Sequence, residues 1–204
     1  TDGAVDRKLS ALSALPAGIA SSRIDELADG RLICVKRQPI EDGGWVATHE
    51  DITEQRLSEV KIEYMAHHDA LTGLANRVLL NDRLEHALGR VQHGEMVAVH
   101  HLDPDQFKAV NDTFGHPCGD KLLRIVAERL RGLVGDADTI ARMGGDEFVI
   151  VQAMIADPAE ATSLAQGVID ALSEPYDIDG QQAVIGVSIG ISVGPGDGSN
   201  PDKL

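Results

Sequence analysis

The chain has 204 residues, of which 43% are apolar, and a formal net charge of −15 at pH 7. This size suffices for one domain with an appendage, whereas the acidic balance argues against nucleic acid or an anionic membrane as a partner. Cys34 and Cys118 lie far apart and form no zinc or redox motif, which fits a reducing compartment. Because no apolar run of about 18 residues occurs, we expect a cytoplasmic segment without membrane contact, although the full-length protein can be membrane-attached through other segments.

Residues 1–53 predict one end of a small domain. The pattern indicates a strand over residues 31–36, a turn over 41–44 and a returning strand over 45–48. Three short motifs resemble the final strands and exit of a PAS sensor domain: Asp29-Gly30-Arg31, Gly43-Gly44-Trp45-Val46 and Glu50-Asp51-Ile52-Thr53-Glu54. Most of that family's ligand-holding region would lie upstream of Thr1, so the resemblance implies no cofactor in this segment.

Residues 54–68 predict a helix. Asp51 followed three residues later by Glu54 is a capping-box signal. The apolar stripe has the steps of a coiled-coil seam and consists of Leu57, Val60, Tyr64 and His67. Two interpretations stay open, a short parallel coiled coil that joins two protomers and a single helix docked on its own domain.

A new domain is expected from Asp69. Gly73 interrupts the helical stripe, and Asn76 supplies the N-cap of a helix that runs to about Val91. Residues 96–102 follow as a strand apolar enough for the centre of a sheet. The exit of that strand carries Asp103 and further acids, which are costly to desolvate without a cation. A metal ion is the simplest source of that charge.

A hairpin is predicted after a helix over residues 119–134. Its strands are residues 139–143 and 148–152, so its tip is Gly144-Gly145-Asp146-Glu147. Gly144 and Gly145 allow a tight reversal and let a large ligand lie against the backbone. Asp146 and Glu147 can hold a divalent cation, and the alternative is a solvated acidic turn.

The remaining elements complete an α+β sheet. Asp157 and Glu160 form a capping box for a helix to about Ser173, and a strand follows over residues 183–193. Without its additions, the order after residue 70 is βαββαβ with helices on one face of the sheet.

Four motifs then carry a family resemblance. They are Asp69-x-Leu-Thr-x-Leu-x-Asn-Arg77, Leu102-Asp-x-Asp-x-Phe-Lys-x-x-Asn-Asp112, Gly115-His116-x-x-Gly119-Asp120 and Gly144-Gly-Asp-Glu-Phe148. Their order and spacing over residues 66–204 resemble the GGDEF domain of the diguanylate cyclase family. The resemblance implies a ferredoxin-like, palm-type sheet that condenses two GTP into cyclic di-GMP and pyrophosphate. It also divides the chain into a partial PAS-like segment (1–53), a coupling helix (54–68) and a C-terminally incomplete GGDEF domain (69–204).

The catalytic expectations follow from this chemistry. Attack of a 3′-hydroxyl on an α-phosphorus requires neutralised phosphate oxygens, and Asp103 with Asp146 can hold Mg²⁺ or Mn²⁺ across neighbouring strands. The resemblance implies that the Pro104 carbonyl completes the metal shell. Glu147 is expected as a further ligand or as the proton acceptor. The competing interpretation of these acids is an acidic rim.

The resemblance also implies the nucleotide contacts. Asn111 and Asp120 would read guanine, because an amide and a carboxylate match its acceptors and its N1 and N2 donors. Lys108 and the backbone amides near Gln106 and Phe107 would meet the β and γ phosphates. Taken alone, Asn111 is a helix cap and Asp120 a first-turn acid. The histidines at 67, 68, 100, 101 and 116 are expected to be structural or exposed.

Two departures from the family leave alternatives open. Gly135 stands where the inhibitory Arg-x-x-Asp motif has arginine, with Asp138 retained, so feedback through a degenerate site is not expected. The family continues with a helix whose lysine and arginine clamp the triphosphate, and Leu204 precedes it. Catalysis needs a homodimer, since one domain holds one GTP. The alternatives are a GTP-binding module that regulates a downstream EAL-type phosphodiesterase, and a dimerisation scaffold that binds no GTP.

Overall fold

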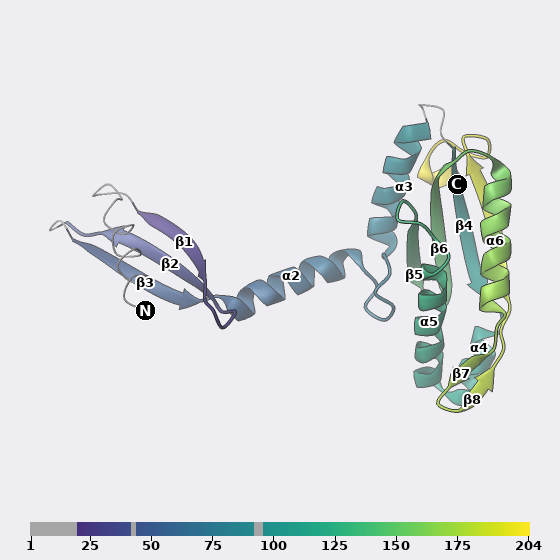
Figure 1. Ribbon diagram of the computed structural model, residues 1–204, viewed down its shortest axis with the longest axis horizontal. Coiled ribbons are helices and arrows are strands. Elements are labelled where there is room, and N and C mark those ends of the chain that lie inside the picture. Colours follow the sequence, from purple (N-terminus) through teal and green to yellow (C-terminus); the bar gives the residue numbers. More distant parts are fainter. Residues whose placement is uncertain (1–19, 42–43, 92–95) are drawn as a thin grey trace. The chain divides into compact units, whose positions relative to one another are not determined.

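The computed structural model of the chain describes residues 20–41, 44–91 and 96–204 (Figure 1). The chain divides into two compact units, Thr1–Ile62 and Glu63–Leu204, and each is described by itself. Within the described residues, none of the helices has the length and apolar character that crossing a membrane requires.

The first unit contains a three-stranded antiparallel sheet in the order β1-β2-β3, built from Ser21–Glu26, Leu32–Pro39 and Trp45–Asp51. The last two strands occupy the positions predicted from the sequence, and β1 was not predicted. The predicted turn at 41–44 includes residues 42–43, which lie outside the described part of the chain. Cys34 and Val35 of β2 are buried, whereas Trp45 is 57% exposed.

Helix α2 (Thr53–His67) follows this sheet where the sequence predicts a helix. Its first turn is fixed by Asp51, whose carboxylate accepts hydrogen bonds from the Thr53 amide at 3.0 Å and the Thr53 hydroxyl at 2.6 Å. The helix has no buried residue, and its apolar side chains Leu57, Val60 and Tyr64 are 65%, 63% and 52% exposed. Such a helix gains little from packing within its own chain.

The second unit is organised around a four-stranded antiparallel sheet in the order β5-β6-β4-β9. These strands are β4 (Met96–Pro104), β5 (Thr139–Gly144), β6 (Glu147–Ile155) and β9 (Val187–Gly194). Between them come α4 (Phe107–Phe114), α5 (His116–Arg131) and α6 (Pro158–Leu172). The predicted βαββαβ order and ferredoxin-like topology are confirmed, with the helix pair α4 and α5 in the first crossover.

Both faces of this sheet are covered, which corrects the expectation of helices on one face. Leu102, Phe148 and Ile150 pack with α5 and α6, while alternate residues such as Val99 and Val149 pack with α3 (Arg77–Val91). Figure 1 shows α3 and α6 on opposite sides of the strands. The reason is that the central strands carry apolar residues at consecutive positions, 97–99 in β4 and 148–151 in β6, and such runs are buried on two faces. Asn76 caps α3 as predicted, accepting from the Val78 and Leu79 amides at 2.9 and 3.1 Å.

The segment after α6 holds elements that the sequence did not reveal. Asp157 and Glu160 form the predicted capping box of α6, but the predicted strand over 183–193 divides into β8 (Gln181–Ala183) and β9. Together with β7 (Tyr176–Ile178), β8 forms a small hairpin, and a 3₁₀ turn (Pro201–Lys203) follows β9. Arg129 secures this region because its guanidinium stacks 3.9 Å over the Tyr176 ring. The same group donates to the carbonyl of Ala171 in the last turn of α6 and to the carbonyls of Glu174 and Pro175, which follow the helix.

Candidate active site

The exit of β4 and the start of β6 lie side by side at one end of the sheet. Leu102 pairs with Phe148 in the antiparallel register, so the next residue of β4, Asp103, is adjacent to Glu147. On its other side Asp103 pairs with Ser188 of β9. Side chains at neighbouring positions of adjacent strands share a face. The register therefore places Asp103, Glu147 and Ser188 on one face of three adjacent strands.

These side chains line an open cleft of about 600 Å³. Its walls come from the three strands: His101, Leu102, Asp103, Glu147, Phe148, Ser188, Ile189 and Gly190. Asp103 and Glu147 are exposed, and within the described residues neither carboxylate has a hydrogen bond or an ion pair with a protein group. Two neighbouring carboxylates without a protein cation repel each other, and a bound cation would relieve that repulsion.

The hairpin formed by β5 and β6 places Asp146 at its tip rather than in this cleft. Gly144 and Gly145 have φ angles of 138° and 58°, in the region that favours glycine, and a Cβ at either position would meet open space. Asp146 is half-buried in the turn and does not line the cleft. The structure therefore brings Asp103 together with Glu147, while Asp146 lies one residue away along the chain.

The donor set fits a divalent ion that also takes ligands from water or from a bound substrate. Within the described residues, no three histidine, cysteine, aspartate or glutamate side chains are grouped closely enough to hold a metal ion by themselves. Mg²⁺ is commonly bound by one or two carboxylates together with substrate phosphates and water. Asp103, Glu147 and the nearby Asp146 supply such hard oxygen donors, and the Pro104 backbone follows directly on β4.

Arg142 anchors the hairpin tip from the side. Its guanidinium donates to the Gly145 carbonyl from Nη2 at 2.7 Å and from Nε at 3.0 Å. Its Nη1 donates to both carboxylate oxygens of Asp69, at 2.9 and 3.0 Å. Burial by itself would raise the pKa of Asp69, but hydrogen bonds from Thr72 and Arg142 outweigh it and hold the pKa below its ordinary value.

The sequence analysis placed Asp69 in a motif and Arg142 in the predicted strand over residues 139–143, but it gave neither residue a role. They lie 73 positions apart, and their pairing depends on the loop that follows α2. One signal was available, since Arg142 precedes Gly144 by two residues on the same strand. An arginine at that distance can reach the carbonyls of the turn. The structure adds both residues to the site as supports of the hairpin.

The predicted base-reading residues meet at the junction of α4 and α5. Gly119 is buried in α5 under the side chain of Asn111, and a Cβ at Gly119 would lie 2.1 Å from Asn111 Oδ1. Only glycine leaves room for that amide. Asp120 is the next residue of α5 and is exposed. Asn111 and Asp120 thus lie on neighbouring helices, outside the lining of the carboxylate cleft.

The start of α4 has an unusual backbone. Gln106 precedes the helix in the left-handed region, with φ of 62°, which is uncommon for a residue other than glycine. Phe107 packs against the buried core and Lys108 is exposed. The turn therefore reverses the chain directly after β4 and leaves the Lys108 ammonium free to reach solvent.

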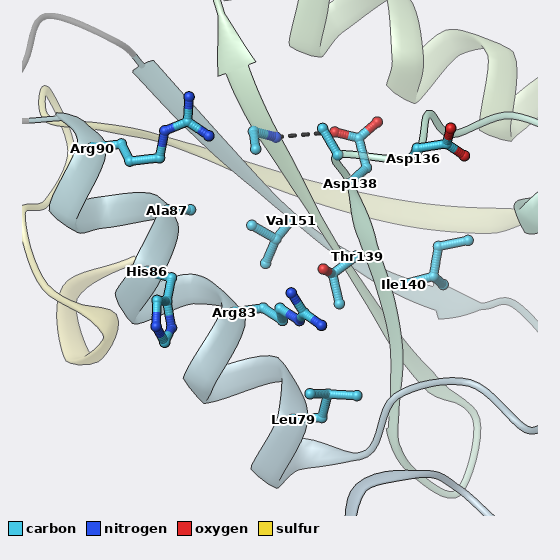
Figure 2. Close-up of a pocket in the computed structure, with 12 residues that line it drawn as sticks. Leu79, Arg83, His86, Ala87, Arg90, Asp136, Asp138, Thr139, Ile140 and Val151 are labelled. Atoms are coloured by element: carbon cyan, nitrogen blue, oxygen red, sulfur yellow. Dashed lines mark hydrogen bonds between the residues drawn. The ribbon is translucent and has the colours of Figure 1, made fainter.

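A second cleft, of about 390 Å³, lies between α3 and strands β5 and β6. In Figure 2 the side chains of Arg83, His86 and Arg90 come from α3, and Asp136 and Asp138 come from the loop before β5. The Asp138 carboxylate accepts from the Gly135 and Ala153 amides, both at 3.0 Å. Asp138 is therefore committed to backbone contacts beside Gly135, where the predicted inhibitory motif lacks its arginine.

Two adjacent histidines of β4 have different surroundings. His101 is exposed and lines the carboxylate cleft, a position that sequence analysis did not assign to it. His100 is buried, its Nε2 lies 3.2 Å from Gln152 Oε1, and its Nδ1 has no partner within the described residues. Burial lowers the pKa of His100 despite the opposing effects of Gln152 and the Asp138 charge. His100 is thus a neutral core residue.

Comparison with protein families identifies both parts of the chain. Residues 66–204 match the family described as "Diguanylate cyclase, GGDEF domain", and residues 2–60 match the PAS fold. An uncharacterized signaling protein of Caulobacter vibrioides is 42% identical over 193 residues, which cover 89% of this chain and 24% of that protein. The bifunctional diguanylate cyclase/cyclic di-GMP phosphodiesterase MucR of Pseudomonas aeruginosa is 48% identical over 142 residues, or 69% of this chain and 20% of MucR.

Solved structures give the same family. The GGDEF domain of TpbB (YfiN) from Pseudomonas aeruginosa has a TM-score of 0.66 at 38% identity, over 68% of this chain and 81% of that one. A sensory box/GGDEF family protein from Caulobacter crescentus has a TM-score of 0.66 at 45% identity, and the match covers 68% of this chain and 90% of that one. The chain spans about a quarter or less of the length of the first curated relatives, at 24% and 20%.

Proposed function

The chain belongs to the GGDEF family, with a PAS-fold segment ahead of that domain, and from this membership we propose that it is the diguanylate cyclase part of a bacterial signalling protein. The reaction joins two GTP molecules into cyclic di-GMP and releases pyrophosphate. Residues 1–53 are the sensor segment, residues 54–68 the coupling helix and residues 69–204 the catalytic domain.

The observation that carries this proposal is a pair of carboxylates, Asp103 and Glu147, in one open cleft beside the β5–β6 hairpin. Neither has a hydrogen bond or an ion pair in the part of the chain that the structure describes. Bound Mg²⁺ or Mn²⁺ would neutralise phosphate charge and favour the 3′-alkoxide. Asp103 and Asp146 would hold this ion together with the Pro104 carbonyl. Glu147 is a further ligand or accepts the proton of the attacking hydroxyl. Gly144 and Gly145 leave space for the nucleotide along the hairpin backbone.

The proposed nucleotide contacts fall into two groups, one for the guanine base and one for the phosphates. Asn111 and Asp120 select guanine, since the amide serves its acceptors and the carboxylate accepts from its N1 and N2. The close fit of Asn111 over Gly119 supports this role because it fixes the direction of the amide. Lys108 and the amides of the turn at Gln106 and Phe107 contact the β and γ phosphates.

A homodimer completes the site, because each domain holds one of the two reacting GTP molecules. The exposed apolar stripe of α2, with Leu57, Val60 and Tyr64, supports pairing with a second copy through a parallel coiled coil. Burial of this stripe against a second copy would remove exposed apolar surface from water, which favours pairing. A signal received by the preceding segment can then change how the two catalytic domains face each other.

A second function is supported by the names of the relatives. The first curated relatives include MucR, a bifunctional cyclase and phosphodiesterase, and NbdA, a cyclic di-GMP phosphodiesterase that is 37% identical over 178 residues. The alternative is therefore a GTP-binding module that regulates a downstream EAL-type phosphodiesterase. Both functions require the guanine-reading residues, but only the cyclase requires turnover.

The deciding experiment incubates the protein with GTP and Mg²⁺ and measures cyclic di-GMP. We expect product from the wild type and none from Asp146→Ala. Asp136→Ala is the matched control, because Asp136 is an exposed acid of the second cleft, and it should retain activity. GTP binding without product in the wild type would reject the cyclase and leave the regulatory module. Absence of GTP binding would reject both and leave a dimerisation scaffold.

A further inference from the structure

Asp105 is a second carboxylate at the exit of β4, two residues after Asp103. It does not line the carboxylate cleft. Its Oδ1 accepts a hydrogen bond from the Ser188 hydroxyl at 2.9 Å, and its backbone amide donates to the Gly186 carbonyl at 3.0 Å. Both partners belong to β9 or to the residue before it. The Asp105 side chain is therefore turned towards β9.

Gly186 is shaped for this carboxylate. A Cβ at Gly186 would lie 2.6 Å from Asp105 Oδ2, closer than real Cβ contacts come, so any larger residue would displace the carboxylate. Asp105 is thus held by a side-chain hydrogen bond from Ser188 and a backbone hydrogen bond to Gly186, and the missing side chain of Gly186 leaves room for its carboxylate. A carboxylate meant to coordinate a metal would instead point its free lone pairs at the cleft.

Asp105 connects two parts of the proposed site, the cleft wall at Ser188 and the turn that opens α4. Its partner Ser188 pairs directly with Asp103 and forms part of the cleft wall. The residue after Asp105 is Gln106, whose left-handed backbone opens α4 and sets the directions of the following amides. Movement of Asp105 would therefore shift the cleft wall and the turn at the start of α4 together.

We propose that Asp105 is a positioning residue of the GTP site and not a metal ligand. Through Ser188 and Gly186 it fixes β9 against the exit of β4, and this fixes the distance between Asp103 and the phosphate-facing turn. The inference rests on the proposed function, because it assigns Asp105 a task in GTP binding and turnover. The sequence alone suggests the opposite, since two aspartates at i and i+2 resemble a pair of ligands.

Isosteric and truncating variants separate the two roles. Asp105→Asn keeps an oxygen that can accept from the Ser188 hydroxyl. Because a neutral hydrogen bond is roughly half as strong as a charge-assisted one, turnover should stay within about fivefold of the wild type. Asp105→Ala and Ser188→Ala each remove the contact, and displacement of about 1 Å at a reacting centre costs up to roughly a hundredfold. The double variant should be no worse than either single variant, because both remove one interaction.

Gly186→Ala tests the fitted glycine independently. The added Cβ should push the Asp105 carboxylate off Ser188 and reproduce the loss of activity seen in Asp105→Ala. Gly186→Ala combined with Asp105→Ala should equal Asp105→Ala alone, because the clash is gone. Gly167→Ala is the matched control, since Gly167 lies in α6 and a Cβ there meets open space.

The decisive readouts are Mn²⁺ affinity in the presence of GTP and hydrogen exchange of the Asp105 amide. A positioning role predicts wild-type Mn²⁺ affinity in Asp105→Asn, and faster amide exchange in Ser188→Ala without any ligand. Loss of Mn²⁺ affinity in Asp105→Asn equal to that in Asp103→Asn would overturn the proposal, as would wild-type turnover and exchange in Ser188→Ala. If the wild type makes no cyclic di-GMP, the cyclase assignment fails, while amide exchange still decides whether Ser188 and Asp105 support the turn.

Discussion

Both clefts described in the second unit contain carboxylates, but the surroundings of those carboxylates differ. In the cleft beside the hairpin, Asp103 and Glu147 have no protein partner within the described residues and face solvent. In the cleft under α3, the Asp138 carboxylate is occupied by two backbone amides. An acid whose lone pairs accept from the backbone stabilises the fold, whereas neighbouring acids left to solvent are available to a ligand. The contrast predicts that activity and stability depend on different acids.

The largest effect is expected from Asp103→Asn. Because the Asp103 carboxylate has no hydrogen bond or ion pair among the described residues, stability should change by less than about 0.5 kcal/mol. Cyclic di-GMP formation should fall by a hundredfold or more, roughly the loss seen when one charge-stabilising group is removed from an active site. Product assay and thermal melting of the same sample check both parts. A variant that melts much earlier, or that keeps its activity, would remove the distinction between the two clefts.

Arg142→Lys is expected to lower both the stability of the fold and the rate of product formation. Lysine cannot bridge the Asp69 carboxylate and the Gly145 carbonyl as the guanidinium does. We expect a destabilisation of about 1–3 kcal/mol, because one ammonium group cannot satisfy both the Asp69 carboxylate and the Gly145 carbonyl. Turnover should also drop because the hairpin tip is released. Urea unfolding and product assay, with Arg83→Lys as an exposed control, measure the two losses; unchanged activity would show that the tip needs no anchor.

Asp138→Ala is the counterpart of Asp103→Asn. Removing its carboxylate leaves the Gly135 and Ala153 amides without acceptors, which should cost about 1–2 kcal/mol. Cyclase activity should persist at temperatures where the variant is folded. Asp136→Ala, with no such contacts, should be neutral in both assays. Loss of activity without loss of stability would assign Asp138 to catalysis and contradict the comparison.

The smallest effect concerns pH and the buried His100. Its pKa lies below the ordinary value of about 6.5, so the folded state binds fewer protons than the unfolded state near that pH. The contribution of neutral His100 to stability is present above pH of about 6.5 and is lost as the pH falls below it, at no more than about 1.4 kcal/mol per pH unit. Urea midpoints between about pH 7 and 5 should fall less steeply in His100→Leu. If the urea midpoint falls equally steeply with pH in the wild type and in His100→Leu, His100 is not the source of this pH dependence.

Much of the fold was predictable because it depends on local signals. Asn76 and the Asp157 capping box mark helix starts, and strand periodicity gave the order βαββαβ. The motif order also identified the family. The second helical layer was missed, because a continuous apolar run such as residues 148–151 does not say which helices cover its two faces. The β7-β8 hairpin was missed because its strands have three residues each.

The site was predictable as a set of residues but not as a set of contacts. Sequence spacing named Asp103, Asp146 and Glu147, yet the strand register decides that Glu147 shares the cleft with Asp103 while Asp146 occupies the turn. The support from Arg142 and the contact between Asp105 and Ser188 join segments distant in the chain. Such pairings depend on tertiary structure, and their residue types alone do not reveal them.

The most direct test of the account is metal-dependent nucleotide binding. Titration of 3′-deoxy-GTP, which lacks the attacking hydroxyl, measures binding without turnover, with and without Mg²⁺. The account predicts Mg²⁺-dependent binding in the wild type and in Asp138→Asn, and at least about a tenfold weaker affinity in Asp103→Asn. Equal Mg²⁺-dependent affinity in Asp103→Asn and the wild type would contradict it, because the open carboxylates would then not be the metal site.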